Sequence, residues 1–221
     1  MDKRFWAIIG IIVVGFGGVL LINNLHKDSS TVAATNHVKG NLQSNVVLLE
    51  YGDYQCSACG QFFPVVQQIQ EKYADKVKFQ FRNLPLVSLH PNAFAAARAA
   101  EAADLQGKFW EMHDKLYENQ DSSGTTGWVV SKDPLNDYFV GYARQLGINT
   151  DTFKKDFASQ KVNDRINADM DAFAATGAKQ ATPTFFLNGK QIDNSNLLDS
   201  SGAPSVDAFS KVIDAALAKQ Q

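Results

Sequence analysis

The sequence predicts one α/β domain that carries a helical insertion and follows an N-terminal membrane-spanning helix. Three observations support this fold class. An uncharged stretch lies within the first 22 residues, a strand–helix–strand pattern follows it, and a strand pair with a closing helix appears only near the C-terminus. A strand–helix–strand unit of this kind forms a right-handed crossover with two parallel strands.

Residues 5–22 are predicted to cross a membrane. This uncharged run follows Lys3 and Arg4, and at 1.5 Å per helical residue it covers about 27 Å, enough for the core of a bilayer. The basic residues place segment 1–4 in the cytoplasm and the rest outside. A cleaved signal peptide is the alternative, with Val32-Ala33-Ala34 as its cleavage site. We expect an uncleaved signal-anchor, because that tripeptide lies well beyond the apolar run.

The remaining chain divides into a stalk and a domain. Residues 23–41 are polar and rich in Ser, Thr and Asn, which predicts a flexible stalk. Residues 42–221 suffice for a single buried core. The chain is 45% apolar and 20% charged, as in ordinary globular proteins. Its net charge of -2, with no basic tract, gives no reason to expect a nucleic-acid partner.

The first part of the domain has the pattern strand, helix, strand. Residues 46–51 are an apolar run interrupted by Glu50, as expected for a strand covered on both faces. Apolar residues recur at helical spacing over 57–73, where Pro64 is expected to kink the helix. Apolar and polar residues alternate over 77–84, which predicts the second strand.

Helices dominate the middle of the chain, and strands return near its end. Alanine-rich and amphipathic segments predict a helical insert over about 90–176, with helices at 93–103, 108–119, 134–146, 150–159 and 162–176 and a loop at 121–131. Residues 184–187 and 190–192 predict a hairpin around Asn188-Gly189. A last helix spans 205–219, with Ser205 as its N-cap. The domain thus comprises a βαβ half, an insert and a ββα half.

Cys56 and Cys59 are the only cysteines, and they form a Cys-x-x-Cys motif directly after the first strand. This position places both sulfurs at the start of a helix, where free backbone N–H groups stabilise a thiolate. The three-residue offset puts them on one face, close enough for a disulfide. Such a small loop contributes little stability, so a redox role suits the motif better than a structural one. Ser57 and Ala58 between them carry no charge.

Other candidate residues are few. Glu50 has two interpretations: a buried carboxylate with a raised pKa that passes a proton to Cys59, or a strand-end acid in solvent. The histidines do not pair at ligand spacing, so no metal site that shares the cysteines is expected, and no cofactor is predicted; they are His26, His37, His90 and His113. His90, beside Pro91, is interpreted as a loop or cap residue.

Together these motifs resemble the thioredoxin superfamily, and within it the DsbA-like branch of thiol:disulfide interchange proteins. Four pieces match in order: residues 50–59 around the cysteines, Pro64, residues 90–93 with 107–110, and residues 182–189. The resemblance covers about residues 42–219. It implies a thioredoxin fold with the helical insertion between its βαβ and ββα halves.

The resemblance also assigns roles to individual residues. It makes Cys56 the nucleophile and Cys59 the resolving thiol, with Ser57 and Ala58 as the dipeptide that tunes redox strength. Strongly oxidising members of the family have a histidine in that dipeptide, and this chain does not. Pro183 is expected to follow a cis peptide bond and, with the backbone of Thr182, to bind an extended substrate. A turn proline before a strand is the alternative for Pro183.

The expected function is an extracytoplasmic thiol-disulfide oxidoreductase, a monomer tethered at the cell membrane, that donates its disulfide to unfolded or reduced exported proteins. The resemblance implies reoxidation by a quinone-linked membrane partner of the DsbB or VKOR type. A disulfide isomerase or reductase of the same fold is one alternative. Bacterial isomerases of the superfamily commonly dimerise through an N-terminal domain, and the stalk is too short to hold one. A membrane-tethered binding domain with a purely structural disulfide is the other alternative.

Overall fold

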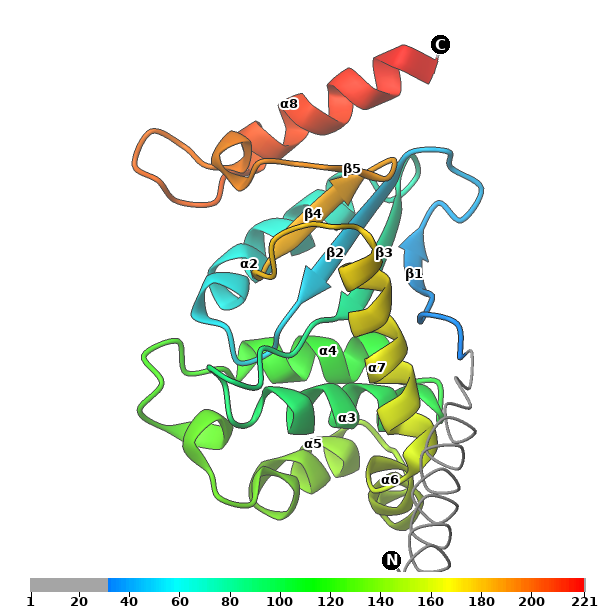
Figure 1. Ribbon diagram of the computed structural model, residues 1–221, viewed down its shortest axis with the longest axis vertical. Helices are drawn as coiled ribbons and strands as arrows, with labels where there is room; N and C mark the ends of the chain where they lie inside the picture. Colours follow the sequence, from blue (N-terminus) through cyan, green and yellow to red (C-terminus); the bar gives the residue numbers. More distant parts are fainter. Residues whose placement is uncertain (1–31, 221) are drawn as a thin grey trace, which may run out of the picture. The chain divides into compact units, whose positions relative to one another are not determined.

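A five-stranded mixed sheet lies at the centre of the fold, in the order β1-β3-β2-β4-β5 (Figure 1). The computed structural model describes residues 32–220. β2 pairs in parallel with β3, and the other neighbouring strands pair antiparallel. The strands are β1 (His37–Gly40), β2 (Val47–Gly52), β3 (Lys78–Asn83), β4 (Thr184–Leu187) and β5 (Lys190–Gln191). The predicted βαβ and ββα halves are both confirmed, and they share one sheet.

Helices cover both faces of this sheet. The helices are α2 (Ser57–Lys72), α3 (Ala93–Asp104), α4 (Phe109–Glu118), α5 (Val140–Gln145), α6 (Thr150–Phe157), α7 (Gln160–Ala175) and α8 (Val206–Leu217). On one face, Ile69 of α2 and Phe209 of α8 belong to one apolar cluster with Leu48 of β2. On the other face, Phe173 of α7 packs against Tyr51 of β2. Burial on both faces explains why β2 is apolar almost throughout.

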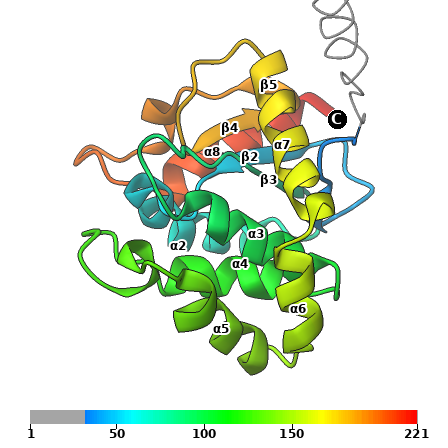
Figure 2. The same cartoon turned by 60° about the horizontal axis from the view of Figure 1, so that its bottom comes forward.

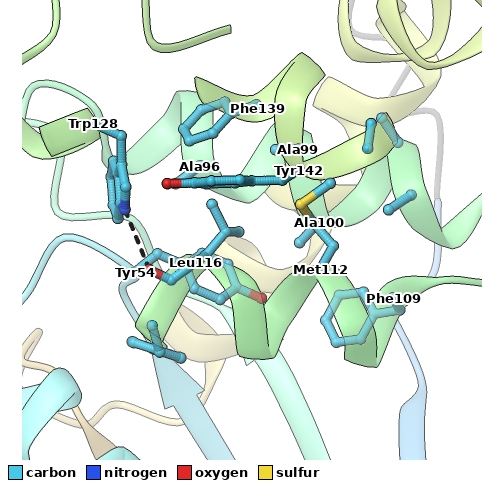
Figure 3. Close-up of a cluster of buried hydrophobic side chains, with 14 of the residues drawn as sticks. Tyr54, Ala96, Ala99, Ala100, Phe109, Met112, Leu116, Trp128, Phe139 and Tyr142 are labelled. Atoms are coloured by element: carbon cyan, nitrogen blue, oxygen red, sulfur yellow. Dashed lines mark hydrogen bonds between the residues drawn. The ribbon is translucent and has the colours of Figure 1, made fainter. Parts of the chain in front are cut away.

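The helical insert has a core of its own. Figure 2 shows α3 and α4 between the sheet and α5. Most alanines of α3 are fully buried, and such small side chains let neighbouring helices approach closely. Against them pack Met112, Trp128, Phe139 and Tyr142 (Figure 3). The same buried cluster extends to Cys56 and Cys59, so the insert and the cysteine motif share one core.

The predicted helices of the insert are confirmed with two local differences. The predicted loop 121–131 contains a short 3-10 helix, Gly127–Val130. Trp128 accounts for it, because its fully buried indole N–H donates to the Leu116 carbonyl at 3.2 Å and anchors the segment to α4 (Figure 3). The predicted helix 134–146 opens with a π-helical turn, Leu135–Phe139, before α5 begins. Ser205 caps α8 as predicted, accepting a hydrogen bond from the Ala208 N–H.

The boundary of the predicted stalk is wrong at its C-terminal end. His37–Gly40, assigned to the stalk, forms β1 and pairs antiparallel with β3. Its neighbour Thr35 is also buried and donates two hydrogen bonds to Asp169 of α7. A four-residue strand with two polar members has no apolar periodicity, so pairing with β3 was not visible in the sequence.

The predicted membrane helix, residues 5–22, lies outside the described residues, as do the 1–4 segment and the first part of the stalk. Over residues 32–220, no helix combines the length and the apolar character needed to cross a bilayer.

Candidate active site

Cys56 and Cys59 lie at the N-terminus of α2, directly beyond the end of β2. Cys56 is the N-cap residue, in extended conformation, and its carbonyl accepts the first helical hydrogen bond from Gly60 at 3.1 Å. Cys56 is 9% exposed as a whole residue, whereas Cys59, one turn further into the helix, is 0% exposed. Both are free thiols. Of the two sulfurs, the outer one is therefore the one a substrate can reach.

The two cysteines have opposite acidities. A hydrogen bond from the Cys59 side chain lowers the pKa of Cys56 to about 5, against the opposing effect of burial. Hydrogen bonds from Thr182 and from the backbone N–H groups of Ala58 and Cys59 also lower the pKa of Cys56. Burial raises the pKa of Cys59 well above its usual value, and its hydrogen bond to Cys56 adds to this. At neutral pH the pair therefore holds one thiolate, on Cys56, and one proton, on Cys59.

The loop that precedes β4 faces Cys56. The Thr182–Pro183 peptide bond is cis, and the Thr182 carbonyl lies 3.4 Å from Cys56 Sγ. The Thr182 hydroxyl is buried and has no hydrogen-bond partner within the part of the chain that the structure describes. Asn194 fixes the loop by donating to the Pro183 carbonyl at 2.8 Å. The structure thus brings residues 126 positions apart into contact.

Glu50 is buried on the face of β2 that α2 covers. It lines a small cavity together with Val66 and Gln70 of α2. Burial raises the pKa of its carboxyl to about 8, and the positive charge of Lys39 opposes this only in part. The negative charge of an ionised Glu50 also raises the pKa of Cys59. Of the two interpretations of Glu50, the solvent-exposed strand end is wrong.

The dipeptide between the cysteines contributes through its backbone. Ser57 is exposed and Ala58 half-buried. Neither carries a charge, and the Ala58 N–H is among the groups that stabilise the Cys56 thiolate. Any charged side chain that acts on Cys56 must therefore come from another segment of the chain.

Sequence reasoning missed the residues that hold the active-site turn. The buried Asp53 carboxylate accepts hydrogen bonds from the backbone N–H of Gln55 and from His90. Gln120 donates to the carbonyls of Tyr54 and Cys56 at 2.6 and 2.9 Å. His90 and Gln120 lie far from the cysteines in the sequence, so no local pattern could have paired them with the motif.

A second cluster of titratable residues joins β1 to the insert. His37 lies 2.7 Å from Glu101 and 3.4 Å from Asp104, and Arg165 of α7 pairs with both acids. Burial alone would lower the pKa of His37, but hydrogen bonds to Asp104 and Glu101 raise it to about 9. The donor set therefore fits an ion-pair network in which His37 and Arg165 balance the two carboxylates.

Comparison with known proteins places this geometry in a family. A family model described as Thioredoxin matches residues 32–215. The chain belongs to the thioredoxin family. Among solved structures, BdbD from Bacillus subtilis is 26% identical, with a TM-score of 0.64 over 84% of this chain and 97% of that one. The thiol-disulfide exchange protein alpha-DsbA2 from Wolbachia pipientis is 19% identical, with a TM-score of 0.65 over 88% of this chain and 93% of that one.

A curated relative of this thioredoxin-family chain bears a different name. The Na(+)/H(+) antiporter NhaA 1 of Salinispora arenicola is 37% identical over 174 residues. The match covers 79% of this chain but 25% of the antiporter, so the chain spans about a quarter of the length of that relative. The name describes a much longer protein. The predicted recognition, a DsbA-like thiol-disulfide oxidoreductase of thioredoxin fold, is confirmed by the family match and the structural neighbours.

Proposed function

We propose that this chain is an extracytoplasmic oxidase that donates a Cys56–Cys59 disulfide to unfolded or reduced exported proteins. The observation that carries the proposal is the asymmetry of the pair. Cys56 is the accessible sulfur and its pKa is lowered to about 5, while Cys59 is fully buried and its pKa is raised. A nucleophile and a resolving thiol need this difference, because exchange proceeds through the more accessible, more ionised sulfur.

The stabilised thiolate favours oxidation of the substrate over its reduction. A group that stabilises Cys56 as a thiolate stabilises the reduced enzyme, so the enzyme disulfide becomes a stronger oxidant. A pKa of about 5 lies well below the ~8.5 of a free cysteine. The neutral Ser57-Ala58 dipeptide does not supply this stabilisation through a side-chain charge, but the helix N-terminus, Cys59 and Thr182 do.

The proposed reaction transfers two electrons. A substrate thiolate attacks Cys56 Sγ of the disulfide, a substrate–Cys56 bond forms, and Cys59 leaves as a thiolate that takes a proton. A second substrate thiol, having lost its proton, then attacks the substrate sulfur of the mixed disulfide. The substrate disulfide forms and Cys56 leaves as a thiolate. The substrate has lost two electrons, and the enzyme, now reduced, requires an oxidant to restore its disulfide.

Glu50 is proposed to supply the proton that Cys59 takes. With a pKa of about 8 the carboxyl is mostly protonated at neutral pH. Its charge interacts with that of Cys59, which places the two groups in one electrostatic environment. Donation from Glu50 would neutralise the Cys59 thiolate in a site where burial makes that charge costly.

The surface around Cys56 suits an unfolded polypeptide. Val87, Leu89 and Val130 are exposed, with Leu89 at 71%. Their segments are held to the active-site turn, because Asp53 accepts from the Leu86 N–H and Gln55 donates to the Val129 carbonyl. Exposed apolar side chains at such a position bind apolar segments of a partner. The backbone of Thr182 is proposed to pair with the extended substrate on the other side of Cys56.

Trapping of the mixed disulfide tests the proposed roles. In cells that produce the full chain, a Cys59→Ser variant is expected to accumulate adducts with exported proteins through Cys56, since the thiol that resolves them is missing. The adducts are detected on non-reducing gels and disappear on reduction. A Cys56→Ser variant is the matched control and should form none. If the two variants behave alike, the structural-disulfide alternative is favoured.

The reduction potential separates an oxidase from a reductase or isomerase. Equilibration with glutathione is expected to give a value well above the roughly −270 mV of thioredoxin. A potential as low as that of thioredoxin would contradict the oxidase proposal while leaving the thiol-disulfide chemistry intact.

The location and the reoxidising partner remain proposals from the sequence. The uncharged run 5–22 behind Lys3 and Arg4 supports a tether with the domain outside the cytoplasm, where disulfides persist. A quinone-linked membrane protein of the DsbB or VKOR type would then reoxidise the cysteines. Fractionation of cells and protease accessibility of the domain test the location.

A further inference from the structure

Asp53 is the centre of a hydrogen-bond arrangement beside the cysteines. Its fully buried carboxylate accepts from the Leu86 N–H at 2.8 Å and from His90 Nδ1 at 2.7 Å through Oδ2, and from the Gln55 N–H at 2.8 Å through Oδ1. A buried carboxylate requires such partners, because an unpaired charge in the interior is costly. Of these donors, His90 is the one that can carry a positive charge.

The segment that bears His90 is held against the active-site turn at further points. The Cys56 N–H donates to the Asp53 carbonyl at 3.1 Å, so the residue that binds His90 also contacts the nucleophile. The Asn92 N–H donates to Gln55 Oε1 at 2.6 Å. The segment is therefore fixed to the active-site turn on both sides of His90, whose side chain remains 23% exposed.

The electrostatics agree with this placement. The hydrogen bond to Asp53 raises the pKa of His90, burial opposes it, and the negative charges of Asp53 and Cys56 add to the rise. Interaction between two charges is reciprocal, so a protonated His90 stabilises the Cys56 thiolate by the same free energy. Asp53 partly offsets the charge of His90 but also holds the ring in place.

We propose that His90 is a positioning residue that, held by Asp53, supplies the positive charge beside the Cys56 thiolate which the Ser57-Ala58 dipeptide lacks. The inference rests on the proposed role of Cys56 as the attacking thiolate. His90 follows Cys59 by 31 positions in the sequence, and the tertiary fold brings its segment to the active-site turn. It acts on the reacting sulfur through its charge and makes no bond to the substrate.

The neighbouring segments leave few other charges to act on this pair. The loop 84–92 that carries His90 contains no other charged side chain, and the segment 127–131 that faces the turn contains none. Asp53 acts on His90 from the turn and Cys56 acts from the start of α2. Oxidation of Cys56 removes one of these negative charges, so His90 should bind its proton less tightly in the disulfide form than in the reduced form.

Titration of the thiolate tests the proposal. In His90→Gln, the Cys56 pKa, followed by thiolate absorbance at 240 nm in the reduced protein, is expected to rise by about half a unit or more. His90→Lys keeps a positive charge and is expected to restore most of the low value. Lys161→Gln, which removes one exposed charge from α7, is the matched control and should leave Cys56 unchanged. An unaltered Cys56 pKa in a folded His90→Gln protein would overturn the proposal.

A second measurement needs no substitution. NMR titration of the His90 ring in the wild-type protein is expected to give a higher pKa in the reduced than in the oxidised form. Equal values would also overturn the proposal, even if His90→Gln failed to fold. This experiment is independent of the proposed function. If Cys59→Ser traps no adducts but the His90 titration still depends on redox state, the oxidase proposal fails and the charge coupling stands.

Discussion

At the scale of single residues, environment rather than residue type separates the roles of the ionisable groups. Cys56 and Cys59 are chemically identical, yet hydrogen bonding lowers the pKa of the first, and burial raises that of the second. Glu50 is also buried, and burial raises the pKa of its carboxyl to about 8. The reduced site therefore holds one thiolate and two protonated groups at neutral pH, which is the charge state that disulfide donation produces.

Glu50→Gln is expected to slow reduction of the enzyme disulfide by a small thiol, by about tenfold at pH 7, because Cys59 loses its proton donor. Above pH 8 the wild-type carboxyl has also lost its proton, so the ratio of wild-type to variant rates should approach one. The rates are measured by stopped flow between pH 6 and 9. A ratio that does not vary with pH would contradict the role of Glu50.

The same substitution gives a stability test with a defined sign. The folded pKa of Glu50 is raised from 4.5 to about 8, so the folded state binds a proton more tightly than the unfolded state. Stability of the wild type then falls as pH rises from 4.5 to 8. Glu50→Gln removes this dependence. At pH 9 the free energy of unfolding of the variant is expected to exceed that of the wild type by on the order of 4 kcal/mol. Urea unfolding at pH 5 and pH 9 measures the difference.

At the scale of elements, β1 extends the sheet through polar contacts rather than an apolar face. His37 stacks on Phe109 with ring centroids 3.5 Å apart and pairs with Glu101. Thr35 donates to Asp169, whose carboxylate also accepts from the Asn83 N–H. These contacts connect β1, β3, α3 and α7. They explain how a short polar strand becomes part of the domain instead of the stalk.

The charge of His37 predicts a pH dependence for this element. Its folded pKa is raised from 6.5 to about 9, so its contribution to stability is fully present below pH 6.5 and is lost as pH rises through 9. The free energy of unfolding of the wild type, relative to His37→Gln, is expected to fall by about 3 kcal/mol at most over this window. Urea unfolding of both proteins at pH 6 and pH 9.5 checks this. A constant difference would show that His37 is neutral in the folded protein.

At the scale of the whole molecule, the cysteine motif and the helical insert share one continuous cluster of buried side chains. The cluster that contains Cys56 and Cys59 also contains Met112 and Trp128 of the insert. A thioredoxin fold with a separately stable insert would divide this cluster in two. We therefore expect the domain to unfold in a single transition.

Met112→Ala tests this continuity. Met112 is fully buried, and truncation leaves a cavity that is expected to cost about 2–5 kcal/mol. Urea unfolding should remain a single transition, with tryptophan fluorescence and Cys59 alkylation reporting the same midpoint. Lys154→Ala on the exposed face of α6 is the control and should change little. Exposure of Cys59 at a higher urea concentration than the fluorescence change would contradict a shared core.

Much of the fold and part of the site could be predicted from local patterns. An amphipathic helix, and a Cys-x-x-Cys motif after an apolar strand, can both be recognised from residues that are close together in the sequence. The predicted bounds of the helices agree within a few positions with the observed bounds. β1 could not be predicted, because its pairing depends on β3 more than thirty residues away. The contributions of His90 and Gln120 were missed for the same reason. Asp53 lies close to Cys56 in the sequence, but its role depends on the distant Leu86 and His90.

The sequence by itself determined the α/β architecture, the insert and the identity of the cysteine pair, because hydrophobic periodicity and motif spacing act over short distances along the chain. The tertiary structure alone decided which groups surround those cysteines. It buries Glu50, sets the Thr182 carbonyl against Cys56, and holds His90 to the active-site turn through Asp53. Acidity depends on burial and on charges and hydrogen bonds within a few ångströms, and those arise only when distant segments fold together.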